Sequence, residues 1–129
     1  MTKKLKVLLT NAPGFNLDKF DIADNKMKGY GLYPPIQLTT ISASALREVK
    51  NFDIEILDLE YELMKHFKEN EKSHLSARDL IKKKILDKID DYQPDIVGIS
   101  VVFSVAHYNN TLIVNTIKEK NPKITVVCG

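Results

Sequence analysis

The chain has 129 residues and a formal net charge of +2, with 43% hydrophobic and 28% charged residues. This length is enough for one domain with a hydrophobic core, so we expect a single domain over residues 1–129. The charge is too small to indicate binding to nucleic acid or to a membrane surface. No apolar stretch reaches the length of a membrane span. The one cysteine, Cys128, excludes an intrachain disulfide and fits a reducing, cytoplasmic location.

The first expected element is a strand over residues 5–10, which is short and aliphatic. It ends at the turn signal Asn11-Ala12-Pro13-Gly14. The segment from Gly14 to Tyr33 has no clean period, which is typical of a functional or disordered loop, and its aromatic residues indicate partial packing. Pro34-Pro35 then begins a helix. Its apolar face is expected to consist of Leu38, Ile41, Ala45 and Val49.

The middle of the chain predicts an outer strand followed by two helices. Residues 53–58 alternate isoleucine with charged residues, which is typical of a strand at the edge of a sheet. A short helix is expected within residues 59–73. Ser76, with Asp79 three residues later, predicts the N-terminal cap of a longer helix. The apolar face of that helix is expected to consist of Ala77, Ile81, Ile85, Ile89 and Tyr92.

The most apolar stretch of the chain is DIVGISVVFS, residues 95–104. Pro94 ends the helix before it, and the run of β-branched residues predicts a central strand that is covered on both faces. The residues expected to be buried are Ile96, Val97, Ile99 and Val101. Ser100 and Ser104 either face a ligand or only cap the next helix, and their spacing is compatible with both.

A helix over residues 105–120 and a strand over residues 124–128 complete the chain, which stops at Gly129. Cys128 lies in that apolar strand and is expected to be a small core residue. Because the chain stops at a strand end, we expect an N-terminal fragment of a larger protein, truncated after its fourth strand. The fourth strand is then an exposed apolar edge through which the isolated chain is expected to self-associate.

The order of the elements predicts an α/β protein: a flavodoxin-like (Rossmann-like), doubly wound parallel sheet with strand order 2-1-3-4 in a three-layer α/β/α arrangement. Ligands of such sheets bind outside the carboxyl ends of the strands, at the switch point between the first and third strands. Three segments are therefore expected to line one crevice there, namely residues 11–14, residues 100–104 and Gly129.

Signatures of several other chemistries are absent from the sequence. No G-x-G-x-x-G follows the first strand and no G-x-x-x-x-G-K-[ST] occurs, which disfavours a dinucleotide fold and a P-loop ATPase. No Ser/His/Asp or Cys/His set is readable. His66 and His74 are expected at the surface, and His107, near the mouth of the crevice, has no partner pattern. We therefore predict no catalytic and no metal-binding residue.

Several segments, in their order and spacing, resemble the N-terminal cobalamin-binding domain of cobalamin-dependent radical S-adenosylmethionine enzymes. The segments are Lys6–Leu9 leading into Asn11-Ala12-Pro13, then Tyr33-Pro34-Pro35, Ile54–Asp58, Pro94–Ser100 and Val126–Gly129. The likeness covers nearly the whole chain. It implies a flavodoxin-like sheet that holds cobalamin, with the nucleotide tail of the cofactor inserted beside the sheet.

The same resemblance implies a set of cofactor-binding residues. The family's Ser-x-Leu after the third strand corresponds to Ser100-Val101-Val102, and its Gly-Gly after the fourth strand is represented by Gly129. Many cobalamin domains offer a histidine to cobalt after the first strand, but residues 11–16 contain none, as is common in the radical enzymes. The implied cofactor-binding residues are Asn11, Pro13, Gly14, Ser100, Val102, Phe103, Ser104 and Gly129.

The resemblance also implies partners and chemistry that one chain cannot supply. The family's iron–sulfur motif needs three cysteines, so this chain alone is expected to perform no radical chemistry. S-adenosylmethionine and the iron–sulfur cluster would belong to a missing C-terminal radical domain of a methyltransferase-like parent. The alternative is a stand-alone flavodoxin-like domain that binds a nucleotide or a partner protein without catalysis.

Overall fold

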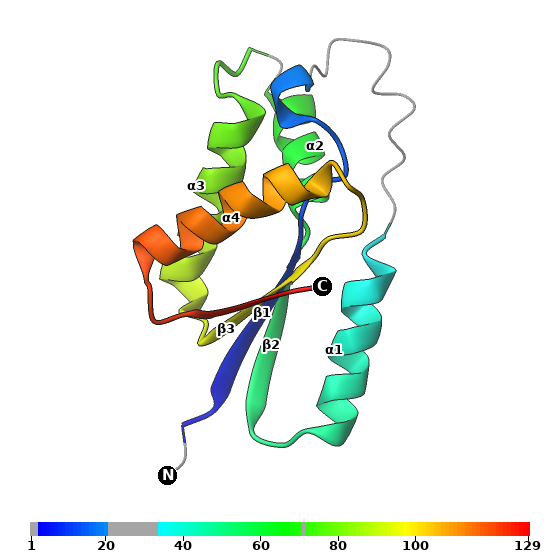
Figure 1. Ribbon diagram of the computed structural model, residues 1–129, viewed down its shortest axis with the longest axis vertical. Coiled ribbons are helices and arrows are strands. Elements are labelled where there is room, and N and C mark those ends of the chain that lie inside the picture. Colours follow the sequence, from blue (N-terminus) through cyan, green and yellow to red (C-terminus); the bar gives the residue numbers. More distant parts are fainter. Residues whose placement is uncertain (1–2, 21–33, 71) are drawn as a thin grey trace.

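Four parallel strands form one sheet in the computed structural model, which describes residues 3–20, 34–70 and 72–129 (Figure 1). The strand order is β2-β1-β3-β4. The strands are β1 (Leu5–Asn11), β2 (Phe52–Leu57), β3 (Ile96–Ser100) and β4 (Thr125–Cys128). The predicted α/β class, the strand order and the position of β2 at an edge are therefore confirmed. Most of the aromatic-rich loop expected before Pro34 lies outside the described residues.

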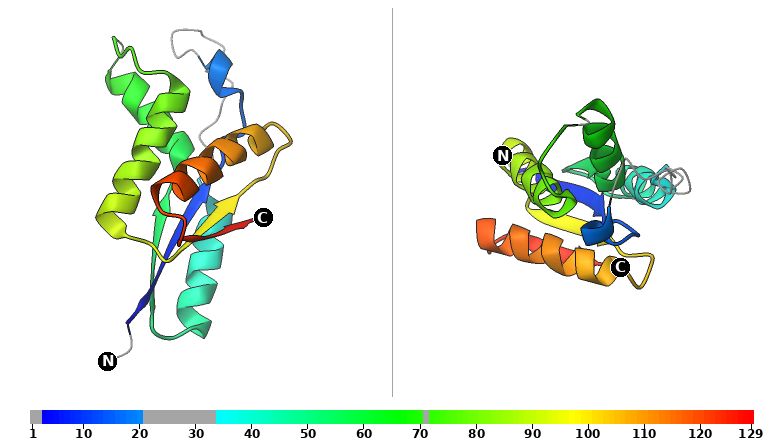
Figure 2. Two further views of the ribbon diagram at one scale, coloured as in Figure 1. Left: turned by 60° about the vertical axis from the view of Figure 1, so that its left-hand side comes forward. Right: turned by 90° about the horizontal axis from the view of Figure 1, so that it is seen from above.

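Four α-helices and a short 3-10 turn surround this sheet in the described part of the chain. The helices are α1 (Ile36–Glu48), α2 (Leu59–Glu69), α3 (Ala77–Tyr92) and α4 (Ala106–Lys120), and the 3-10 turn η1 is Leu17–Lys19. Helices α3 and α4 pack against each other on one side of the sheet, and α1 lies on the other side (Figure 2). This arrangement gives the three-layer α/β/α fold that the element order predicts.

The main core lies between the sheet and the helices α2, α3 and α4. Leu8 of β1 and Val97 of β3 are register partners, so their side chains share this face of the sheet. The predicted apolar face of α3 is buried in full. The Ser76 hydroxyl oxygen accepts a hydrogen bond from Asp79 N at 3.1 Å, which confirms the predicted cap. The spacing of the apolar residues and the cap residue together predicted this helix correctly.

The opposite face of the sheet is covered less completely, because α1 packs over β1 and β2 and leaves β3 and β4 more open. Val97 and Ile99 are 0% and 3% exposed. Ile96, on the α1 side, is only half-buried, and so is Val101, which follows the strand. The expectation that all four residues are buried was therefore wrong for these two. An apolar run does not reveal how far the neighbouring helix reaches across the sheet.

The predicted apolar face of α1 is also wrong in part. Leu38 is buried and Ala45 is half-buried, but Ile41 and Val49 are each 54% exposed. Ile41 lies on the flank of α1 rather than above the sheet, and Val49 follows the last residue of the helix. The buried residues of α1 are therefore only Leu38 and Ser42.

Cys128 is exposed, which contradicts its expected place in the core. It ends β4, an edge strand in which three of the four residues are exposed. Its Sγ lies 3.5 Å from Asn110 Oδ1 of α4. An apolar strand at the edge of a sheet has one neighbouring strand instead of two, and its last residue lacks cover. Self-association through this edge stays a prediction.

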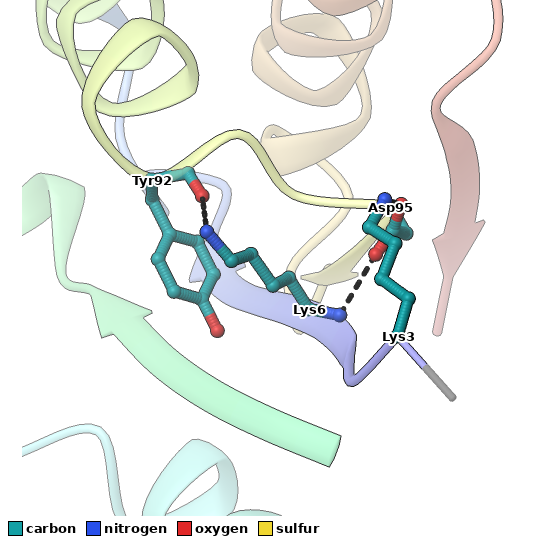
Figure 3. A network of polar contacts seen from close by, with 4 residues as sticks. All are labelled: Lys3, Lys6, Tyr92 and Asp95. Atoms are coloured by element: carbon teal, nitrogen blue, oxygen red, sulfur yellow. Dashed lines mark hydrogen bonds and ion pairs between the residues drawn. The ribbon is translucent and has the colours of Figure 1, made fainter. Parts of the chain in front are cut away.

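At the amino-terminal ends of the strands, Asp95 joins β1 to the start of β3 (Figure 3). Its carboxylate accepts hydrogen bonds from Lys6 N and from Lys3 Nζ, each at 2.9 Å. The Lys6 ammonium reaches Tyr92 O at 3.1 Å. The backbone N–H of Lys6, followed by the Lys3 ammonium, lowers the pKa of Asp95 below its ordinary value. The ionised carboxylate therefore stabilises the fold.

We expect Asp95→Asn to reduce stability at neutral pH and to have much less effect in acid. A carboxyl group with a lowered folded-state pKa stabilises the fold above its unfolded-state pKa of about 3.9. That contribution disappears as the pH falls through the folded-state pKa. Urea titrations of both proteins at pH 7 and near pH 2.5 measure the difference in unfolding free energy. A difference that does not shrink in acid would contradict this role of the carboxylate.

Candidate functional site

A cavity of about 300 Å³ opens at the carboxyl ends of β1 and β3. The strand order reverses between these two strands, so the cavity occupies the switch point of the sheet. Asn11 and Ala12 line it at the end of β1, and Ser100, Val102 and Phe103 line it at the end of β3. The first turn of α1 and Glu60 of α2 complete the wall. The cavity therefore lies where the sequence predicted a crevice.

The loops after β1 and β3 lie side by side, as predicted. Ala12 N donates a hydrogen bond to Ser100 O at 2.9 Å. A Cβ atom at Gly14 would lie 2.7 Å from Phe103 Cδ2, so a larger residue at position 14 would displace that ring. Gly129 is tied to the end of β3, because its carbonyl accepts from Val101 N at 2.8 Å. The three predicted segments thus meet at one edge of the sheet.

Asn109 of α4 holds the loop after β1 in place. Its side-chain amide nitrogen donates to Pro13 O at 2.7 Å and to Phe15 O at 2.8 Å. Asn109 and Pro13 are both buried, so Pro13 supports the crevice instead of contacting a ligand. The sequence offered one unused signal for Asn109: it lies four residues before Ile113, on the buried face of its helix.

The Asn11 side chain also makes hydrogen bonds within the fold. Its amide nitrogen donates to Asp58 Oδ1 at 3.0 Å, and its Oδ1 accepts from Leu59 N at 2.8 Å. Asp58 in turn caps α2 by accepting from Tyr61 N at 3.1 Å. Asn11 therefore fixes the start of α2 beside β1, and its backbone and side-chain edge only border the cavity.

The two serines after β3 have different surroundings. The Ser100 hydroxyl donates to Gln37 Oε1 at 3.1 Å and so links β3 to the first turn of α1. The N-cap residue of α4 is Val105, and no side chain caps this helix. Ser104 contributes only its carbonyl, which accepts from His107 N at 3.2 Å. The alternative that both serines cap the helix with their side chains is therefore wrong.

The structure divides the eight predicted binding residues into two groups of four. The residues that line the cavity are Asn11, Ser100, Val102 and Phe103. The residues that lie beside it without lining it are Pro13, Gly14, Ser104 and Gly129. Sequence reasoning missed the residues 34–38 and Glu60. Residues 34–38 come after β1 and Glu60 comes after β2 in the chain. The carboxyl ends of these strands lie at the same edge of the sheet as the cavity, and that placement could have indicated these residues.

Within residues 3–20, 34–70 and 72–129, no group of three or more His, Cys, Asp or Glu side chains could hold a metal ion. His107 is exposed on α4 and is not part of the cavity wall.

No helix in the described part of the chain is long and apolar enough to cross a membrane. The sequence matches no protein-family model and no curated protein, and the fold matches no solved structure.

Proposed function

We propose that this chain is a cofactor-binding module that takes cobalamin in the crevice between β1 and β3. The observation that carries the proposal is the cavity of about 300 Å³ at the switch point, bordered by the Ser100 and Gln37 side chains. This volume lies at the lower end of the range for small-molecule sites, so it suits one end of a large cofactor. The remainder of the cofactor would lie over the mouth of the crevice.

The residues at the mouth fit a ligand with broad apolar faces. Phe103 is 61% exposed, Ile36 is 66% exposed, and both line the cavity. Exposed apolar side chains gathered at a cavity are typical of a ligand-binding surface. The described cavity wall contains no histidine, so this chain would hold cobalamin without an imidazole on cobalt. Bound cobalamin supplies the cobalt-centred chemistry, and these residues would bind and orient it.

The exposed apolar residues of α1 support a second candidate, a domain that binds a partner protein. Ile41 and Leu46 of α1, and Val49 directly after it, are between 54% and 59% exposed. A partner would remove these side chains from water. Such a partner could be the radical domain that the family resemblance implies. The two candidates are compatible, because α1 has its first turn at the crevice and these residues lie further along it.

We expect the wild-type chain to bind hydroxocobalamin and Ser100→Leu to bind it at least about fivefold more weakly. The substitution removes a hydroxyl from the cavity wall and adds bulk there. Absorbance titrations measure both affinities, and the spectrum reports the cobalt ligand. Ser104→Leu is the matched control, because Ser104 lies in the same loop but does not line the cavity.

Three results would count against this proposal. Equal affinities of wild type and Ser100→Leu would mean that the crevice is not the site. A spectrum of histidine-ligated cobalt would contradict the absence of an imidazole ligand. Failure of the folded wild-type chain to bind hydroxocobalamin would overturn the cofactor assignment.

A further inference from the structure

Glu60 is the one charged side chain among the described residues that line the crevice. It lies in the first turn of α2 and is half-buried. Its Oε1 accepts a hydrogen bond from Gly14 N at 2.8 Å, which holds the carboxylate against the loop after β1. No lysine or arginine belongs to the described wall, so no cation there offsets its charge.

The wall retains hydrogen-bonding capacity of two kinds. A carboxylate has two oxygens with about four acceptor positions, and Gly14 N occupies one of them. The Gln37 carbonyl oxygen accepts from Ser100, and the Gln37 amide nitrogen makes no hydrogen bond to the described residues. The Asn11 amide is already tied to the start of α2, because its nitrogen donates to Asp58 and its oxygen accepts from Leu59 N. The crevice thus offers a charged acceptor at Glu60 and a neutral donor at Gln37.

We infer that Glu60 determines which ligand end the crevice accepts: a group with an N–H donor, a carboxamide above all, is accepted and a phosphate monoester is rejected. A carboxamide has both a donor and an acceptor, which match Glu60 and Gln37. A phosphate monoester carries a charge of about −1.5 to −2 at pH 7 and would face the carboxylate with no compensating cation among the described wall residues. The amino-terminal end of α1 offers only about half a positive charge.

This inference deepens the proposed function and rests on it for one of its two tests. Cobalamin carries carboxamides around its ring and has no phosphate monoester. Flavin mononucleotide has a phosphate monoester, and riboflavin is the same molecule without it. The same side chain would therefore favour the first ligand and exclude the phosphate of the second.

The first test is equilibrium dialysis of hydroxocobalamin against the wild type, Glu60→Gln and Glu69→Gln. Glu60→Gln retains an oxygen for Gly14 N but removes the charge, and we expect about tenfold weaker binding. Glu69→Gln makes the same change at the exposed end of α2 and should leave the affinity unchanged.

The second test uses flavin mononucleotide and riboflavin with the same three proteins. Glu60→Gln should bind flavin mononucleotide several-fold more tightly than the wild type does, with no gain for riboflavin. The inference is overturned if Glu60→Gln binds hydroxocobalamin as tightly as the wild type does. It is also overturned if Glu60→Gln binds flavin mononucleotide no more tightly than the wild type does, which includes the case that neither protein binds it. If the wild type binds no hydroxocobalamin, the cobalamin proposal fails, and the flavin pair alone decides the role of Glu60.

Discussion

Replacing Asn109 by alanine is expected to destabilise the protein by about 2–4 kcal/mol. The buried side-chain amide of Asn109 donates to two carbonyl groups of the loop after β1, and truncation leaves the buried Pro13 carbonyl without this donor. The loss of a donor to a buried carbonyl costs more than the hydrogen bond itself contributes. Urea denaturation followed by far-ultraviolet circular dichroism measures the change.

Asn110→Ala is the matched control for this prediction. Asn110 is the next residue of α4 and is half-buried, and its side chain contacts Cys128 Sγ at 3.5 Å. We expect this variant to lose less than about 0.5 kcal/mol, as is usual for a substitution near the surface. Equal losses in the two variants would contradict the anchoring of the loop by Asn109, since alanine is the better helix former at both positions.

Ile99→Ala is expected to cost about 2–5 kcal/mol, the range for truncation of a large buried side chain. Ile99 is 3% exposed and belongs to the main core. Ile96→Ala removes the same atoms from the same strand on the half-covered face, so its cost should be about half as large or less. A loss below about 1 kcal/mol for Ile99→Ala, or equal losses for both variants, would contradict the unequal covering of the two faces.

The topology of the sheet could be predicted because each element carries its own local signal. The alternation in residues 53–58 indicated an edge strand, and Ser76 with Asp79 indicated a helix start. These signals depend on neighbours within a few residues, so they survive in a single sequence. Once the order of elements was known, the winding rules placed the ends of β1 and β3 at one crevice.

The errors concern features that depend on contacts between distant segments. Cys128 follows an apolar run and Ile41 lies at helical spacing from Leu38 and Ala45, but their burial is decided by which other elements reach them. Glu60 and Asn109 were missed for a related reason. Each serves the crevice through a residue of the loop after β1, at a sequence separation of 46 for Glu60 and up to 96 for Asn109. A single sequence carries no direct record of such pairs.

The narrow attachment of α1 has a consequence for how the molecule fluctuates. α1 buries only Leu38 and Ser42, whereas α3 and α4 each bury six residues. Elements with few buried contacts open at a lower free energy than the core, so the backbone amides of α1 exchange with solvent hydrogen ahead of those of α3 and α4. Because Gln37 and its neighbours form one wall of the crevice, a ligand bound there would contact a helix that opens more readily than α3 or α4. Occupancy of the crevice and slowed hydrogen exchange in α1 are thereby thermodynamically linked.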